Sequence, residues 1–210
     1  MPTLRAQQKR ATRGLLFDVA MRLFERAGYA SVSVDDIVRE ASVARGTFYF
    51  HYESKEDVLY EAVRRGEVEI SARMAAVDLE RPLRDVLQAT CDGFADIWGG
   101  ARREFLGEAG AVGMRRIVAA RQERDNEPLR LELVKHVERA LVAGELRSTL
   151  PAQMLADVFL LDVFAALMAW AATGEPALDV VMVGMIELFL RGAEGFGTPP
   201  TPPTPRPKRR

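Results

Sequence analysis

Cysteine is nearly absent from the 210-residue chain, and Cys91 is the single example. One cysteine cannot form an intramolecular disulfide, and this scarcity is typical of a reducing compartment, so we expect a cytoplasmic protein. The first thirteen residues lack the apolar segment of a signal peptide. A long apolar stretch at residues 155–172 is interrupted by Asp157 and Asp162. We therefore expect a buried helix there and no membrane role.

Sequence motifs for catalysis and metal binding are also missing. The chain contains no GxSxG nucleophile elbow, no HExxH zinc motif, no Walker loop and no Cys/His cluster with metal spacing. The two histidines, His51 and His136, fall in different predicted domains. Gly107, Gly110 and Gly113 follow no predicted strand, which excludes a dinucleotide fingerprint. We expect no enzyme, no cofactor and no bound metal.

Net charge is close to zero, at −1, but it is unevenly distributed. Residues 1–55 carry nine Lys and Arg against six Asp and Glu, whereas residues 56–197 carry sixteen against twenty-four. The last segment, residues 198–210, is rich in proline and has four basic residues and no acidic one. A basic head on an acidic body indicates that the head binds phosphate. The tail is expected to be disordered or polyproline-like.

Apolar residues repeat at helical spacing along the chain, and glycine or proline lies between the repeats. In the first repeat Leu16, Val19, Leu23 and Phe24 share a face, and Gly28 ends it. The pattern predicts an all-α protein of about nine helices, over residues 6–27, 34–41, 44–51, 55–77, 82–98, 101–119, 127–143, 151–173 and 178–194. Three glycines weaken the stretch at 101–119. It is either a poorly formed connecting helix or a segment that moves or admits a ligand.

Residues 33–55 predict two short helices joined by a tight turn. Ser33 can cap the first helix, and Asp36 stands at the reciprocal capping-box position. In the second helix Phe48 faces inward, while Tyr49 and Phe50 face away from it. A helix this short must be held by packing. An outer face that mixes a cation, a hydroxyl, a bare glycine and two aromatics suits the major groove of DNA better than open solvent.

This segment strongly resembles the helix-turn-helix of TetR-family transcriptional regulators. The resemblance rests on the run Gly-Thr-Phe-Tyr-Phe-His-Tyr at residues 46–52, followed by Ser54, Lys55 and Glu56, and it covers about residues 12–60. It implies a three-helix DNA-binding domain at residues 1–53 and a helical ligand-binding and dimerisation domain at 54–197. The matching positions commonly contact DNA in the family, which implies contacts from Ser33, Arg45, Gly46, Thr47, Tyr49, Phe50, His51 and Lys55.

Some of these positions leave alternatives open. His51 is either a buried, hydrogen-bonded histidine or a phosphate donor. Phe50 stands where the family often has Tyr or a polar residue, so a hydroxyl contact is lost there. Phe48 and Tyr52 are expected in the core. A basic arm ahead of the domain could follow the phosphate backbone or be a solvated face; it comprises Arg5, Lys9, Arg10 and Arg13.

The acidic body is expected to hold an effector. An apolar pocket with few polar groups could be lined by aromatic and sulfur side chains together with a histidine and a carboxylate. The candidates are Phe94, Trp98, Phe105, Met114, His136, Asp162, Phe164, Met168 and Trp170. Taken singly, each of these residues is more readily explained as plain core. Asp162 is costly in its apolar surroundings unless it is paired.

The last two predicted helices are apolar almost all round, which a terminal helix of one small domain cannot easily bury alone. They are expected to pack on a second copy of the chain. This agrees with the four-helix dimer interface that the resemblance implies. The predicted interface residues are Phe159, Val163, Val181, Met185, Leu188 and Phe189.

The sequence thus predicts a homodimeric regulator that binds double-stranded operator DNA and is released from a palindromic site by a small apolar effector. Two alternatives remain: a DNA-bound structural or division-control protein without an effector, and a helical small-molecule-binding protein that has lost DNA binding. The presence of Arg45, Tyr49 and Lys55 argues against the second alternative.

Overall fold

The computed structural model describes residues 3–100, 103–119 and 127–195, and the predicted tail at 198–210 lies outside them. Within these ranges the chain forms helices and no strand, which confirms the predicted all-α class. The helices are α1 (Leu4–Ala27), α2 (Val34–Glu40), α3 (Arg45–His51), α4 (Lys55–Ala75), α5 (Leu83–Trp98), α6 (Arg103–Ala119), α7 (Pro128–Val142), α8 (Ala152–Thr173) and α9 (Leu178–Gly195).

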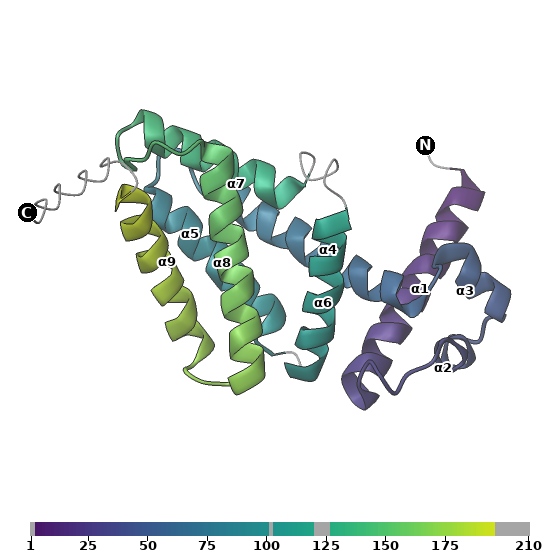
Figure 1. Ribbon diagram of the computed structural model, residues 1–210. Helices are drawn as coiled ribbons and strands as arrows, with labels where there is room; N and C mark the ends of the chain where they lie inside the picture. Colours follow the sequence, from purple (N-terminus) through teal and green to yellow (C-terminus); the bar gives the residue numbers. More distant parts are fainter. Residues whose placement is uncertain (1–2, 101–102, 120–126, 196–210) are drawn as a thin grey trace, which may run out of the picture.

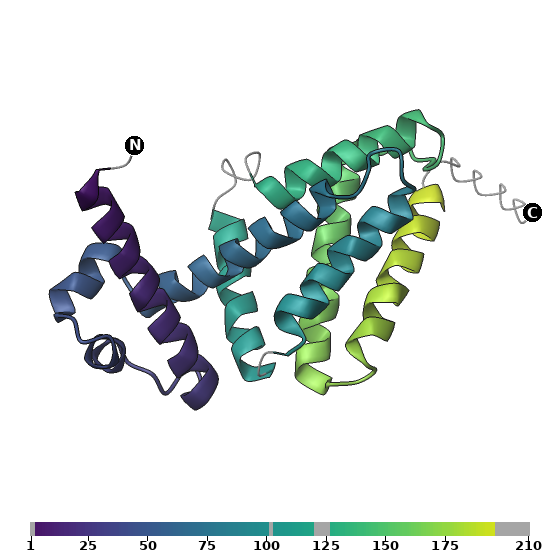
Figure 2. The same cartoon turned by 180° about the vertical axis from the view of Figure 1, so that it is seen from behind.

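Helices α1, α2 and α3 form one end of the molecule, and α5 to α9 form the larger body (Figure 1). Helix α4 starts beside the small end and runs into the body, where it packs on α5, α6 and α7 (Figure 2). The two parts are therefore joined through a continuous helix. A shift of α4 would carry the small end with it.

Local sequence signals account for the short helices at the small end. Ser33 caps α2 and Ser54 caps α4, each in a reciprocal capping box with an aspartate three residues on. Each box satisfies two backbone amides that lack a partner at a helix start. Gly28 follows α1 with φ +84°, a conformation that a side chain would disfavour. The predicted caps and the predicted glycine stop are confirmed.

The core of the small end holds α3 in place. Phe48 and Tyr52 are buried together with Leu16, Phe24 and Ile37, from α1 and α2. A seven-residue helix has little stability of its own, so this packing is what maintains it. The predicted core roles of Phe48 and Tyr52 are confirmed.

Helix α6 is more regular than the sequence predicts. It is continuous across Gly107, Gly110 and Gly113. Gly110 has a packing role, because a β-carbon there would overlap Sδ of Met168 and lie 2.9 Å from its Cε. Of the two alternatives, a poorly formed helix is wrong for this segment. Glycine is instead used where α6 and α8 approach closely.

The last two helices pack on each other and on the body, and part of the predicted dimer interface needs correction. Phe159, Val163 and Phe189 are buried within the subunit, and the rings of Phe159 and Phe189 meet edge to face at 5.1 Å. These three side chains are at most 5% exposed and offer little surface to a partner. Val181 and Met185 are partly buried, and Leu188 is 60% exposed.

Helix α8 is the one described helix that is long and apolar enough to cross a membrane by length and composition alone. Its mean hydropathy is 1.9 over the most apolar window. In the fold it packs against α6, α7 and α9, as a core helix of a helical body does.

Candidate functional site

The exposed face of α3 carries the residues predicted to contact DNA. Phe48 is fully buried on one side of the helix, whereas Tyr49 and Phe50 are 46% and 67% exposed. Arg45 and Gly46 are also exposed, and Thr47 is half-buried. A β-carbon at Gly46 would meet nothing within 4 Å, so this position lies open on the surface. The helix thus presents a continuous outer face that another molecule can approach closely.

Arg45 is oriented by two neighbours. Its Nη1 lies 2.9 Å from Oδ1 of Asp35 on α2, and its Nη2 donates to the Tyr49 hydroxyl at 3.4 Å. Both members of the Arg45–Asp35 pair are well exposed, and such pairs contribute only about 0–1 kcal/mol. The guanidinium can therefore exchange Asp35 for a guanine edge or a phosphate at little cost.

His51 ends α3 and is partly buried. Its ring meets Phe50 edge to face at 5.1 Å. Burial lowers the pKa of His51, and the positive charges of Lys9 and Arg13 lower it further, so the ring is neutral at pH 7. Nδ1 is buried and finds no hydrogen-bond partner in the described part of the chain. Of the two alternatives for His51, the absence of a described partner at Nδ1 gives no support to the hydrogen-bonded histidine, and the phosphate donor stays a prediction.

Lys55 has a structural contact that the sequence did not indicate. Its Nζ donates to the backbone carbonyls of Tyr29 and Val32, each at 2.9 Å, and lies 4.4 Å from the centre of the Tyr29 ring. The ammonium thus ties the start of α4 to the loop between α1 and α2. With two donors used in this way, Lys55 positions α2 and α3, and we infer no phosphate contact from it.

Two of the four basic residues predicted as an arm lie beside α3. Lys9 lies 4.8 Å over the ring of Phe50. Arg13 is anchored more firmly, because its Nε donates to Glu61 on α4 at 2.8 Å and its Nη1 donates to the carbonyl of His51 at 3.1 Å. Tyr52 also donates to Glu61, at 2.9 Å. This cluster ties α1, the end of α3 and α4 together.

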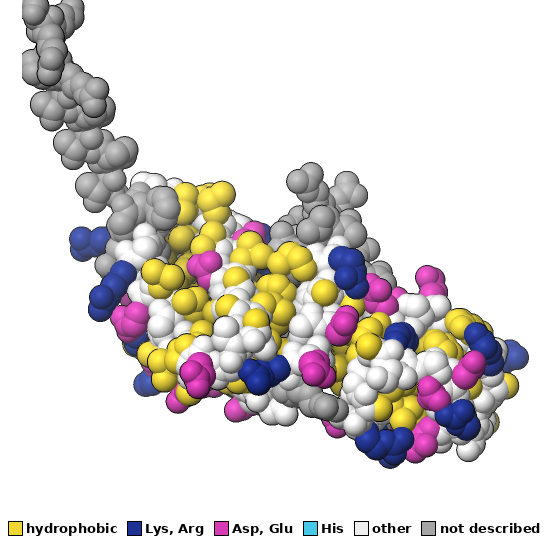
Figure 3. All heavy atoms as spheres, turned by 60° about the horizontal axis from the view of Figure 1, so that its bottom comes forward, with side chains coloured by type: hydrophobic (Ala, Val, Ile, Leu, Met, Phe, Trp, Pro, Cys, Tyr) yellow, Lys and Arg dark blue, Asp and Glu magenta, His cyan; other side chains and the backbone are white. Residues whose placement is uncertain are grey.

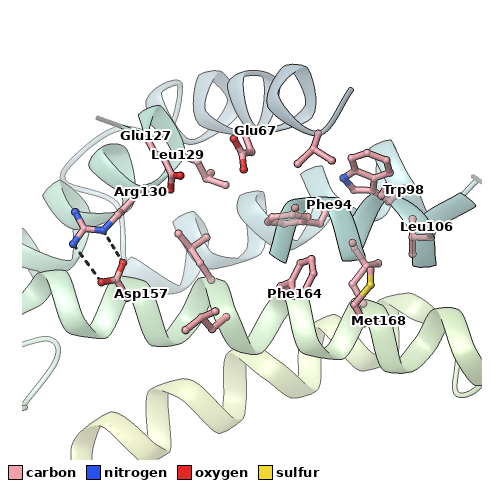
Figure 4. Close-up of a pocket in the computed structure, with 17 residues that line it drawn as sticks. Glu67, Phe94, Trp98, Leu106, Glu127, Leu129, Arg130, Asp157, Phe164 and Met168 are labelled. Atoms are coloured by element: carbon pink, nitrogen blue, oxygen red, sulfur yellow. Dashed lines mark hydrogen bonds and ion pairs between the residues drawn. The ribbon is translucent and has the colours of Figure 1, made fainter. Parts of the chain in front are cut away.

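A cavity of about 100 Å³ lies inside the body, between α4, α5, α6, α7 and α8 (Figure 4). Its walls are mainly apolar. The aromatic and sulfur part consists of Phe94, Trp98, Phe164 and Met168, and the aliphatic part includes Val63, Leu106, Ala109, Leu129, Leu160, Leu161 and Leu167. Gly110 and Gly113 of α6 complete the wall. A concave, mostly apolar space of this kind is typical of a small-molecule site.

Four charged residues also line the cavity. Arg130 and Asp157 form a two-pronged ion pair at one end, with Nε–Oδ1 at 2.6 Å and Nη2–Oδ2 at 3.3 Å. Glu67 of α4 and Glu127 line the same cavity (Figure 4). Burial raises the pKa of Glu67 to about 7, and the nearby charge of Glu127 raises it too. Near neutral pH this carboxyl group can therefore exist in either form.

The structure brings together part of the predicted ligand set. Phe94, Trp98, Phe164 and Met168 line the cavity, as the sequence predicted. Phe105 lies behind Trp98, with their ring centres 6.5 Å apart. The lining does not include Met114, His136, Asp162 or Trp170. His136 is buried, with Nε2 3.8 Å from Glu132, and contributes to the packing of α7.

Sequence reasoning missed the charged lining residues. Glu67, Glu127 and Arg130 occur in helices among many other charges, and each looks like part of a solvated face. Asp157 gave a signal, because it interrupts an apolar run, but nothing in the sequence named Arg130 as its partner. In the described part of the chain, no three His, Cys, Asp or Glu side chains are placed to hold a metal ion.

Comparisons with known proteins agree with this arrangement. Residues 16–62 match the family model described as bacterial regulatory proteins, tetR family. The HTH-type transcriptional regulator AcrR of Shigella flexneri is 40% identical over 55 residues, which is 26% of this chain and 26% of that one. The chain thus matches about a quarter of that curated relative's length.

Solved structures extend the likeness to the body. A complex of SmeT with triclosan has a TM-score of 0.63 at 21% identity, over 94% of this chain and 100% of that chain. FadR of Thermus thermophilus, a TetR-family repressor bound to lauroyl-CoA, has a TM-score of 0.63 at 22% identity, over 92% and 98%. These likenesses show a shared fold from the small end through the body. Residues 16–62 thus carry the N-terminal domain of the tetR family of bacterial regulatory proteins, and the chain as a whole shares the fold of these solved structures.

Proposed function

We propose that the protein is a ligand-responsive transcriptional regulator of the cytoplasm, a repressor that leaves a palindromic operator when a small, mainly apolar effector enters the body. It acts by binding, with no catalytic role. The observation that carries the proposal is the pairing of an outward-facing helix α3 with a mostly apolar cavity in the body, the two being joined through α4 and α6. SmeT and FadR, which share the fold, are bound to triclosan and lauroyl-CoA.

The DNA-binding half of the proposal rests on α3. Arg45 and Tyr49 present polar groups on its exposed face, and Phe50 adds an apolar surface that suits a thymine methyl group. One such helix reaches only a few base pairs, so two copies related by a twofold axis are needed for a specific site. The proposed DNA-binding domain comprises residues 1–53, and residues 54–197 form the body.

The face of α8 and α9 that remains exposed supports a homodimer. Hydrophobic side chains gather on the body, on the side that carries these helices (Figure 3). Those exposed on the two helices include Met154, Val158, Leu161, Val180, Val183 and Leu188. Large exposed apolar patches mark interaction surfaces. We propose that this face packs against the same face of a second copy of the chain. The exposed residues then form the dimer interface, and the buried Phe159, Val163 and Phe189 do not.

Contacts between aromatic rings connect the cavity to the small end. Trp98 lies in the cavity wall, Phe105 of α6 lies behind it, and the ring of Phe24 on α1 is 6.3 Å from Phe105. Phe24 in turn meets Tyr29 edge to face at 5.1 Å. An effector that displaces α6 would thus displace α1 and the loop before α2. The shift occurs only if the effector binds the two arrangements with different affinity.

A second link runs along the surface. Arg115 of α6 lies 3.1 Å from Glu56 in the first turn of α4. Helix α6 therefore contacts both the core of the small end and the helix that carries it. We propose that α6 transmits effector binding, and that the separation of the two α3 helices in the dimer changes as a result.

Selection of bound sequences from random double-stranded DNA tests the proposal. We expect a palindrome whose half-sites are separated by one helical turn or a multiple of it. Arg45→Ala should relax the preference at one position per half-site and weaken binding by about 1–3 kcal/mol. Enrichment of no sequence by the purified full chain would refute the regulator. An equal loss on every sequence would assign Arg45 to phosphate instead.

A further inference from the structure

Glu67 is an unusual member of an apolar cavity wall. It extends from α4 into the space lined by Phe94, Trp98 and Phe164 (Figure 4). The ion pair that the structure shows for it, with Arg64 on the same helix, is long at 3.8 Å. The Glu67 side chain is 24% exposed, so its carboxylate is partly desolvated, which is unfavourable unless a cation or hydrogen-bond donors compensate its charge.

Among the described residues, no basic side chain lies close enough to the Glu67 carboxylate to compensate its charge fully. On α4 the neighbour is Arg64, and from α7 and its N-cap the neighbours are Arg130 and Glu127. Arg130 is bound to Asp157 of α8. The described lining residues of α5 and α6 are uncharged. Among the described residues that line the cavity, carboxyl groups therefore outnumber basic groups.

We propose that the cavity takes a lipophilic organic cation, an ammonium that carries an aromatic or branched alkyl group. The positive charge lies against Glu67, and the aromatic rings of the wall enclose the apolar part. The proposal rests on the proposed effector site and names its ligand class. Both parts of the wall favour a cation, because aromatic faces attract cations and Glu67 gains a closer positive charge than the Arg64 guanidinium at 3.8 Å.

An anionic ligand would bind unfavourably in this cavity. It would lose its hydration at Glu67 and Glu127 and be repelled by both when they are ionised. The guanidinium of Arg130 is held by Asp157, so an anion would have to break that pair. The cavity thus favours cationic ligands over anionic ones.

The proposal has a consequence for pH. A bound cation favours the ionised form of Glu67, so binding releases a proton when the free carboxyl group is protonated. The pKa of Glu67 in the free protein is about 7. A permanently charged ligand should therefore bind about tenfold more tightly at pH 8 than at pH 6, because the ionised fraction rises by about that factor. A neutral ligand should not gain affinity over this range.

Two probes of almost the same shape test the charge directly. Phenyltrimethylammonium and tert-butylbenzene differ only in a charged nitrogen and a neutral carbon. We expect isothermal titration calorimetry on the full chain at pH 8 to show at least tenfold tighter binding of the cation. Glu67→Gln keeps the shape of the side chain and should remove most of this preference together with the pH dependence. Glu69→Gln, on the same helix and outside the cavity lining, is the matched control.

The outcomes separate this proposal from the proposed function. Equal affinity for the two probes, tighter binding of hexanoate than of the ammonium, or an unchanged preference in Glu67→Gln would each overturn the cation proposal. Absence of phenyltrimethylammonium binding at 10 mM would overturn it as well. None of these results affects DNA selection, which tests the regulator with no ligand present.

Discussion

Gly110 offers a direct test of the cavity, because its hydrogen faces the end of Met168. Replacing it with alanine puts a methyl group where Sδ of Met168 now lies, and 2.9 Å from Cε. Methionine is flexible, so the thioether can move. We expect it to move into the cavity of about 100 Å³, where it stays among apolar neighbours and takes up space that a ligand needs.

The expected magnitudes separate stability from ligand binding. Gly→Ala within a helix stabilises by about 0.5–1 kcal/mol, and a side chain forced from its rotamer costs about 0.5–1.5 kcal/mol. The two effects nearly cancel, so the melting temperature should change by only a few degrees. Filling a cavity of this size with a displaced side chain costs a ligand about 1–3 kcal/mol, which corresponds to a loss of affinity of about 5-fold to 150-fold.

The assay is the dissociation constant of toluene, a small neutral ligand, measured by calorimetry beside a thermal melt. Gly107→Ala is the matched control on α6, since a β-carbon there meets nothing within 4 Å. It should gain stability and leave toluene binding unchanged. The double variant Gly110→Ala/Met168→Ala should recover binding, because it removes the displaced atoms. Unchanged affinity in Gly110→Ala alone would show that the thioether moves outward, and the reasoning would be wrong.

Other changes test the small end and the subunit surface. Lys55→Met should lower stability by about 1.5–3 kcal/mol, because it removes charged hydrogen bonds to two carbonyls, and it should leave the salt dependence of DNA binding unchanged. A slope reduced by about one unit would restore a phosphate contact. Burial alone would raise the pKa of Glu61, but hydrogen bonds from its neighbours outweigh it and lower the pKa below its usual value. Its stabilisation is thus present above about pH 4.5 and is lost as pH falls through the lowered pKa. The stability difference between wild type and Glu61→Gln in urea should accordingly shrink from pH 7 to pH 3, and a constant difference would argue against the ion cluster. Leu188→Glu should give folded monomers by light scattering, whereas Phe189→Ala should destabilise the subunit by about 3–5 kcal/mol. A Leu188→Glu variant that stays dimeric would move the interface elsewhere.

Sequence periodicity predicted the helices well, and strong local signals mark the ends of several of them. Ser33 and Ser54 cap α2 and α4, and Gly28 and Gly174 follow α1 and α8 with positive φ. These signals act over three or four residues, so they can be read without knowing the tertiary fold. The predicted limits agree with the observed ones to within a few residues.

Contacts between distant residues could not be read in the same way. The spacing of apolar residues in a helix indicates which residues are buried, but it does not identify the element or subunit that they pack against. Phe159 and Leu188 look alike in the sequence, yet one is buried inside the subunit and the other is exposed. Lys55 resembles a phosphate ligand by position, but its ammonium is captured by carbonyls 23 and 26 residues earlier. Such choices depend on three-dimensional packing.

The charged lining of the cavity follows from the same limitation and suggests how the protein is regulated. Glu67 lies on α4, the helix that also carries the small end, and Trp98 beside it begins the aromatic contacts to Phe105 and Phe24. A ligand that pairs with Glu67 therefore acts on α4 directly and on α6 through the rings. Both routes lead from the cavity to the small end. A ligand that acts through both should therefore discriminate more strongly between the DNA-binding arrangement and the released arrangement. An apolar ligand without charge would use the second route alone, and we expect it to release DNA less completely at saturation than a cation of the same shape.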